Sequence, residues 1–246
     1  MSGADEMPRH PGPLAIAQAL VVTFGGQAAL VAGVAAAAAE VGCAAIARRC
    51  PRRGAATIVA AAVAYEATVA PWMRQWGSTA EERRQELPGD DLVSDPGLVI
   101  DHGVTIAAPP ESVWPWLAQI GQDRGGFYSY EWLENLAGCK MRNAERVDPE
   151  WQRREVGEPV MLHPAAPGLP VTIFEPGRVI GLEGWGVFVI EPAAGGSRTR
   201  LIARGRIPRG SATLFYRGLL EIPHFVMQRK MLLGIKQRAE AAAAQP

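Results

Sequence analysis

The sequence predicts an α+β fold, in which an antiparallel sheet packs with one long C-terminal helix and an N-terminal α-helical hairpin precedes both. Three patterns indicate this fold. Alternation of apolar and polar residues begins at Leu98, short apolar runs separated by Gly- and Pro-containing turns follow, and apolar residues recur at helical spacing near the C-terminus. We divide the 246 residues into an apolar hairpin, a linker and a main domain, at residues 1–76, 77–97 and 98–246.

Two apolar stretches make up the N-terminal part. Residues 13–39 carry no charged side chain, a length that can cross a bilayer as a helix. Residues 54–73 are interrupted by Glu66, a carboxylate that is costly inside a membrane unless it is paired. A basic connector lies between them, with Arg48, Arg49, Arg52 and Arg53. We predict a helical hairpin that anchors the chain to a membrane, with the number of spanning helices and the sidedness left open. The alternative is a soluble hairpin packed on the following domain.

The linker and the first strand follow in order. Residues 79–96 are charged and end in Pro- and Gly-containing turns, which predicts a short helix and then a loop. From Leu98 to Ile106 every second residue is apolar or His102, which predicts a strand with one face in the core.

Two short helices and several strands are predicted next. The first helix begins at Glu111, after a pair of prolines. The second runs from a cap at Ser129 to Leu136 and ends at Gly138. Turn sequences then separate five apolar runs, which we predict to be strands at residues 159–162, 171–174, 179–183, 187–191 and 199–207. A final helix is predicted from Pro223 to about Ala242.

Large aromatic side chains gather in residues 121–138, close behind Trp114 and Trp116. Such a cluster forms either the centre of a core or the wall of a cavity. The acidic residues beside it, Asp123, Glu131 and Glu134, are predicted to be solvated, because carboxylates are rarely buried unpaired.

The C-terminal helix carries one polar residue in the middle of its apolar face. His224, Met231 and Ile235 lie on this face at helical spacing, and Gln228 lies between them. Either Gln228 and His224 bond to protein groups in a closed core, or they line a cavity and meet a ligand or water. The same two readings apply to His102.

Four segments resemble a known superfamily. They are TIAAPPESVWPWL at residues 105–117, GGFYSYEWLENLAG at 125–138, EPGR at 175–178 and PHFVMQRKMLLGIK at 223–236. Together with the element order, residues 95–242 resemble the helix-grip fold of the START/Bet v 1-like superfamily, also called SRPBCC or polyketide cyclase/dehydrase-like. The resemblance implies a sheet curled around the long helix, with a hydrophobic cavity between them. It implies no shared catalytic residues.

Composition excludes several other classes of function. Lys and Arg number 25 and so do Asp and Glu, so no overall field favours nucleic acid. The three cysteines have neither an even count nor the short paired spacing of a disulfide framework or a zinc site. No phosphate loop, dinucleotide fingerprint or nucleophile elbow is found, so we predict no metal, no cofactor and no catalytic residues.

Three functions remain open. The first is binding or carrying a hydrophobic, lipid- or polyketide-like molecule at a membrane; the second is a cyclase/aromatase-type enzyme; the third is a partner-binding membrane protein without a ligand. The oligomeric state is left open. The predicted ligand-binding residues are Trp116, Phe127, Tyr130, Trp132, Asn135, His102, His224, Phe225, Gln228, Met231 and Ile235.

Overall fold

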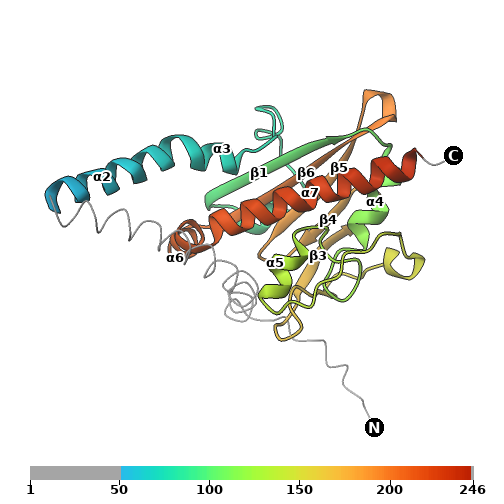
Figure 1. The fold of residues 1–246 in the computed structure, drawn as a ribbon. Helices are drawn as coiled ribbons and strands as arrows, with labels where there is room; N and C mark the ends of the chain where they lie inside the picture. The colour runs from blue at the N-terminus through green and yellow to red at the C-terminus, as the bar shows by residue number, and fades with distance from the viewer. Residues whose placement is uncertain (1–50, 245–246) are drawn as a thin grey trace, which may run out of the picture.

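A computed structural model describes residues 51–244, which form an α+β domain from which an N-terminal helix projects (Figure 1). This helix runs through α2 (Pro51–Ala64), a π-helical turn (Tyr65–Val69) and α3 (Ala70–Arg74). Within the described residues, no helix combines the length and the apolar character that a membrane span requires. The predicted apolar stretch at residues 13–39 lies outside the described residues.

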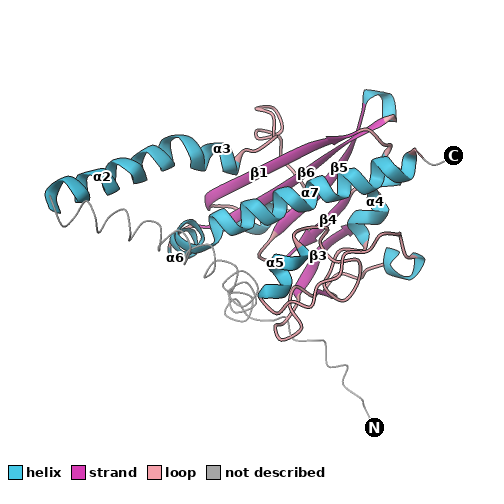
Figure 2. Cartoon of the chain, viewed as in Figure 1, coloured by secondary structure: helices cyan, strands magenta, loops and turns pink. Residues whose placement is uncertain are grey.

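The sheet has six antiparallel strands in the order β1-β6-β5-β4-β3-β2 (Figure 2). The predicted strands are confirmed, with β2 shorter than expected. Their bounds are β1 Pro96–Ile106, β2 Pro159–Val160, β3 Leu169–Glu175, β4 Val179–Leu182, β5 Gly186–Ala193 and β6 Arg198–Pro208. Strands β1 and β6, the first and last in the chain, pair along their length, with His102 opposite Ala203.

Residues 77–97 pack on the outer face of the sheet. The predicted short helix is wrong, because residues 80–84 form turns instead, and the backbone N–H groups of Thr79 and Glu82 donate to each other's side chains at 2.7 and 3.1 Å. A 3-10 helical turn follows at Asp90–Val93. Arg204 on β6 is buried beneath this segment and donates to Asp101 at 2.6 Å and to Asp90 at 2.8 Å. This ion-paired layer covers one face, so the other face is left for the main core.

The short helices are α4 (Pro110–Ala118) and α5 (Glu131–Leu136). Gly138 has φ +87° and follows the end of α5, as a helix-ending glycine does. The predicted cap at Ser129 is wrong, because the hydroxyl of Ser129 donates to the carbonyl of Met227 at 3.2 Å instead. Ser129 therefore joins the α4–α5 loop to the C-terminal helix.

The C-terminal helix begins earlier than predicted. Helix α6 (Ser211–Phe215) continues through a π-helical turn (Tyr216–Leu220) into α7 (Glu221–Ala243). Pro223 has no N–H and its ring crowds the preceding turn, and a π-helical turn accommodates both defects without ending the helix. Figures 1 and 2 show α7 lying across the inner face of the sheet, where Leu232 and Ile235 are fully buried.

The projecting helix is fastened to the start of α7 by a cluster of charges. Arg74 donates to Glu221 at 2.5 Å, and Tyr65 donates to the same carboxylate at 3.1 Å. Glu66 pairs with Arg74 at 3.3 Å and with Arg217 at 2.6 Å. The carboxylate that interrupts the second apolar stretch is thus ion-paired.

Candidate functional site

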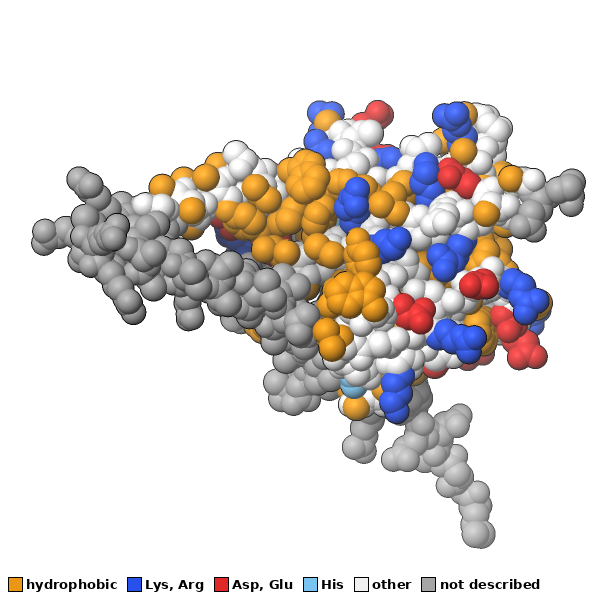
Figure 3. All heavy atoms as spheres, viewed as in Figure 1, with side chains coloured by type: hydrophobic (Ala, Val, Ile, Leu, Met, Phe, Trp, Pro, Cys, Tyr) orange, Lys and Arg blue, Asp and Glu red, His pale blue; other side chains and the backbone are white. Residues whose placement is uncertain are grey.

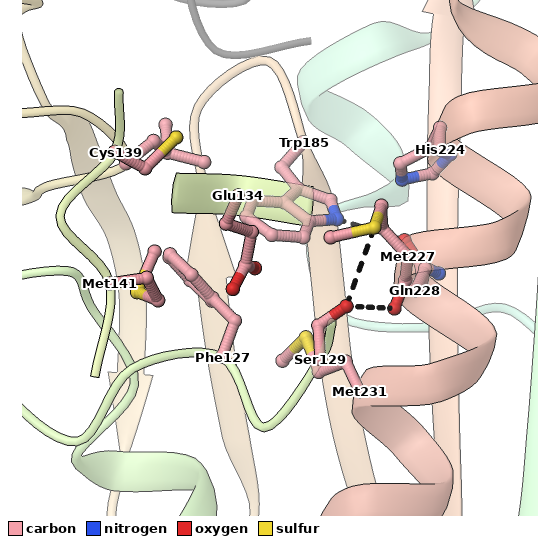
Figure 4. Close-up of a pocket in the computed structure, with 11 residues that line it drawn as sticks. Phe127, Ser129, Glu134, Cys139, Met141, Trp185, His224, Met227, Gln228 and Met231 are labelled. Atoms are coloured by element: carbon pink, nitrogen blue, oxygen red, sulfur yellow. Dashed lines mark hydrogen bonds between the residues drawn. The ribbon is translucent and has the colours of Figure 1, made fainter. Parts of the chain in front are cut away.

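A pocket lies between the first half of α7, the α5 corner and the β4–β5 turn (Figure 4). Its volume is about 20 Å³, which is room for about one water molecule. The lining is mostly apolar and comes from segments far apart in the sequence: Phe127, Ser129, Glu134, Cys139, Met141, Leu162, Trp185, His224, Met227, Gln228 and Met231.

Gln228 is the centre of a hydrogen-bond chain behind the pocket. Its Oε1 accepts from Nε1 of Trp185 at 2.9 Å, and its Nε2 donates to Nδ1 of His102 at 3.1 Å. Nε2 of His102 donates in turn to the carbonyl of Met73 at 2.8 Å. Gln228 therefore bonds to protein groups, as the first reading expects, and it also lines the pocket.

Both histidines near the pocket are held neutral by burial. The pKa of His102 is lowered to about 4, mainly by its removal from water. The pKa of His224 is lowered to about 3 by the same cause and by the neighbouring His102. The hydroxyl of Tyr216 and Nδ1 of His224 are hydrogen-bonded at 2.6 Å, which fixes the ring.

Glu134 differs from every other polar group in the lining. The side chain was expected to be solvated, but the residue is 4% exposed and its Oε2 has no hydrogen-bond partner. Burial, and secondarily the charge of Glu131, raises the pKa of Glu134 to about 7. Beside it, burial raises the pKa of the Cys139 thiol to about 11, so that group stays protonated at neutral pH.

Glu134 faces inward together with its neighbour Leu133. Leu133 and Glu134 are adjacent positions on a helix of six residues, and both are turned toward the core. The sequence signal for this was the spacing to Tyr130 and Ala137, one turn away on either side. That spacing was outweighed by the general rarity of buried carboxylates.

Of the predicted ligand-binding residues, Phe127, His224, Gln228 and Met231 line the pocket. Trp132 does not. It is 66% exposed, because Leu133 and Glu134 form the inward side of α5 and Trp132 lies roughly 150° around the helix from the middle of that side. Figure 3 shows the face of the molecule on which such exposed apolar side chains gather.

Two other residues of the aromatic segment lie beside the pocket without lining it. Tyr130 is half-buried at the N-terminus of α5, with Nζ of Lys230 5.7 Å from its ring centre. Asn135 bonds through both amide atoms to the backbone of Met141, at 2.5 and 3.0 Å. Asn135 thereby positions a pocket residue instead of meeting a ligand itself.

The remaining predicted residues belong to the core. Trp116 packs edge-on against Tyr128 at 5.8 Å, and Ile235 is fully buried. Phe225 packs edge-on against Trp72 at 5.3 Å, so it holds the projecting helix to the domain. His102 lies one hydrogen bond behind the pocket wall.

Sequence reasoning missed Trp185, Met141 and Met227 as pocket residues. Trp185 follows Gly184, whose φ of +75° makes the tight β4–β5 turn that swings the indole over the pocket. An aromatic residue between two glycines in a hairpin was the available signal.

The arrangement offers hydrogen bonding and apolar contact, and one titratable carboxyl. Within residues 51–244, no cluster of three or more His, Cys, Asp or Glu side chains could hold a metal ion. No protein-family model matches the chain, and none of the curated proteins compared with it matches either.

Proposed function

We propose that this chain is a helix-grip protein that binds a small, mostly apolar molecule in the pocket between α7 and the sheet, at a membrane. The observation that carries the proposal is the position of the pocket. It lies between the long helix, the sheet and the short-helix corner, the place where the resemblance to the START/Bet v 1-like superfamily implies a ligand cavity.

The lining supports entry of a molecule larger than water. Met141, Met227 and Met231 surround the pocket, and methionine side chains change rotamer at low cost and repack around varied shapes. A cavity of about 20 Å³ holds no apolar ligand as it stands. Rotation of these side chains is therefore part of the proposal.

The projecting helix supports the membrane part of the proposal. Its side chains from Val59 to Ala64 are exposed and uncharged, and Val59 and Val63 are each 62% exposed. Trp72 on α3 and Ile222 on α7 are further exposed apolar side chains, at 57% and 44% exposure. Exposed apolar surface of this kind marks a membrane or protein contact.

That same surface favours the second candidate function, partner binding without a ligand. The two functions differ in what the pocket does. The enzymatic alternative has less support, because both pocket-side histidines are neutral and hydrogen-bonded to neighbouring groups.

The test is ligand extraction and probe binding on the full chain. The protein is kept free of detergent, because detergent alkyl chains would compete with the ligand for the pocket. Organic extraction followed by mass spectrometry is expected to yield a bound apolar compound. The neutral fluorophore N-phenyl-1-naphthylamine is expected to bind, and Met141→Trp, which fills the pocket, to abolish binding. Leu136→Trp, at a 60% exposed position of the same corner, is the matched control. An empty extract together with no probe binding would leave partner binding as the function.

A further inference from the structure

The carboxyl of Glu134 lies in the lining of the pocket, and the backbone that carries it is hydrogen-bonded on both sides (Figure 4). Its backbone N–H donates to the carbonyl of Tyr130 at 3.0 Å, and its own carbonyl accepts from Cys139 at 3.0 Å. The side chain is held on a locked helical turn, and its Oε2 is buried with no hydrogen-bond partner. A buried carboxyl oxygen left unsatisfied costs folding free energy that a hydrogen-bond donor would offset.

The charges around the pocket decide which donor fits. None of the eleven residues that line it is Lys or Arg. His224 and Cys139 are neutral, because burial lowers the pKa of the first to about 3 and raises that of the second to about 11. The only formal charge that this lining can carry is therefore negative, on Glu134. A ligand carboxylate or phosphate would be repelled, and a cation would be attracted.

The walls fit the rest of such a ligand. Phe127, Leu162, Met227 and Met231 offer apolar contact on the sides of the carboxyl. The indole of Trp185 belongs to the same lining, and an aromatic face attracts an ammonium group. The cavity of about 20 Å³ matches a head group, and the methionines would move to admit a short chain.

A single water molecule is the competing occupant, because the cavity has room for one and a water would satisfy Oε2. Water and an ammonium group differ in what they require. A water can donate to an amide oxygen in place of a carboxylate and keep one hydrogen bond, whereas an ammonium group also loses the attraction of the opposite charge.

We propose that the pocket selects a small apolar molecule carrying a primary ammonium group, which donates a charge-assisted hydrogen bond to Glu134; this rests on the ligand-binding function proposed above. The specificity-determining residue is then Glu134, and the ligand class is a short-chain aliphatic or aromatic amine.

The test is calorimetric titration of the full chain with three probes of equal length: n-hexylamine, n-hexanol and hexanoate. We expect hexylamine to bind at least tenfold more tightly than hexanol, and hexanoate to bind least. Glu134→Gln keeps the shape of the side chain and removes its charge. This substitution is expected to lower hexylamine affinity at least tenfold and to change hexanol affinity less than threefold.

Glu131→Gln is the control for a general negative field. Glu131 is exposed, lies on the same helix and accepts from the backbone of Asn143 at 3.1 Å. Its substitution is expected to change hexylamine affinity less than twofold, and circular dichroism verifies that both variants fold. An equal loss in both variants would overturn the proposal.

The outcomes separate this inference from the proposed function. If hexanol binds as tightly as hexylamine and neither responds to Glu134→Gln, the amine selectivity is wrong and apolar binding stands. If no probe binds and the organic extract is also empty, ligand binding itself is wrong. Binding of hexylamine that Glu134→Gln leaves unchanged assigns Oε2 to a structural water and overturns the inference.

Discussion

Nε2 of Gln228 on α7 lies 3.1 Å from Nδ1 of His102 on β1, and this bond ties the long helix to the first strand across the core. The amide has one acceptor role and one donor role here, and both are used, since its Oε1 accepts from Trp185. The histidine must be neutral to accept, which agrees with the lowering of its pKa to about 4 by burial. A polar residue in the middle of an apolar helix face is thus a structural junction as well as a pocket wall.

Gln228→Leu is expected to destabilise the protein by about 2 kcal/mol, because it leaves the buried Nδ1 of His102 without its donor. Urea unfolding followed by far-ultraviolet circular dichroism measures this. Gln237→Leu on the exposed side of the same helix is the matched control and should change stability by less than about 0.5 kcal/mol. A Gln228→Leu variant as stable as the parent would show that the chain of bonds through Gln228 contributes nothing.

The strands and the order of elements could be predicted because their signals are local. Leu201, Ala203 and their partners in β1 alternate with residues of the opposite face, and each strand is bounded by Gly or Pro. Side-chain period and turn chemistry depend only on neighbours in the sequence. The same reasoning placed α4, and it placed the end of α5 at Gly138.

The pocket could be predicted only in part, because its geometry depends on distant contacts. Ser129 has the sequence position of a helix cap, but α7 offers it the carbonyl of Met227, 98 residues away. Trp132 and Glu134 exchange the places that their hydrophobicity predicts, because the side of α5 that packs on the core holds Leu133 and Glu134. Trp185 is brought to the pocket by a turn whose direction is fixed by tertiary packing.

Glu134 should make stability depend on pH with an unusual sign. Its pKa is about 7 in the folded chain against 4.5 for an ordinary glutamate, so the folded state binds more protons in the interval between the two values. The free energy of unfolding therefore decreases as pH rises through this interval, because the folded state favours the protonated carboxyl. The titratable groups around this carboxyl are Glu131 on its own helix and, in the same pocket lining, Cys139 in the following loop and His224 on α7.

Comparison with Glu134→Gln isolates this effect, because the other titrating groups are common to both proteins. The stability advantage of the variant over the parent is expected to grow by roughly 2 kcal/mol between pH 5 and pH 8. Urea unfolding at closely spaced pH values measures it. A constant difference across this range would mean that the buried carboxyl titrates normally.

The ion-pair cluster at Glu221 is expected to hold the projecting helix against the domain. The Glu221 carboxylate is 2% exposed and accepts from Arg74 and Tyr65, so Glu221→Gln leaves the half-buried guanidinium of Arg74 with the more exposed Glu66 as its remaining counter-charge. Amide hydrogen exchange in residues 65–74 should accelerate at least tenfold, while the β1–β6 ladder keeps its protection. Asp95→Asn breaks an exposed pair with Arg209 and is the control, because such pairs contribute little. Equal exchange in both variants would contradict the assigned role.

Gly234 in the middle of α7 is required by the approach of the α4–α5 loop. A Cβ at this position would lie 2.8 Å from Cβ of Tyr128, closer than side-chain carbons pack, and would also meet the Tyr128 carbonyl. The loop cannot easily retreat, because Tyr128 is 1% exposed, has φ +55° and donates its backbone N–H to Asn143 at 2.6 Å. Alanine has a higher helix propensity than glycine by about 1 kcal/mol, but overpacking of a buried contact costs about 1–3 kcal/mol.

Gly234→Ala should therefore lower the free energy of unfolding by about 1 kcal/mol or more, measured by urea unfolding. Gly218→Ala, in the π-helical turn with no atom within 4 Å of the added carbon, should leave stability unchanged or raise it. The opposite signs expected at two helical glycines separate steric approach from propensity, and a stabilised Gly234→Ala variant would refute the steric role.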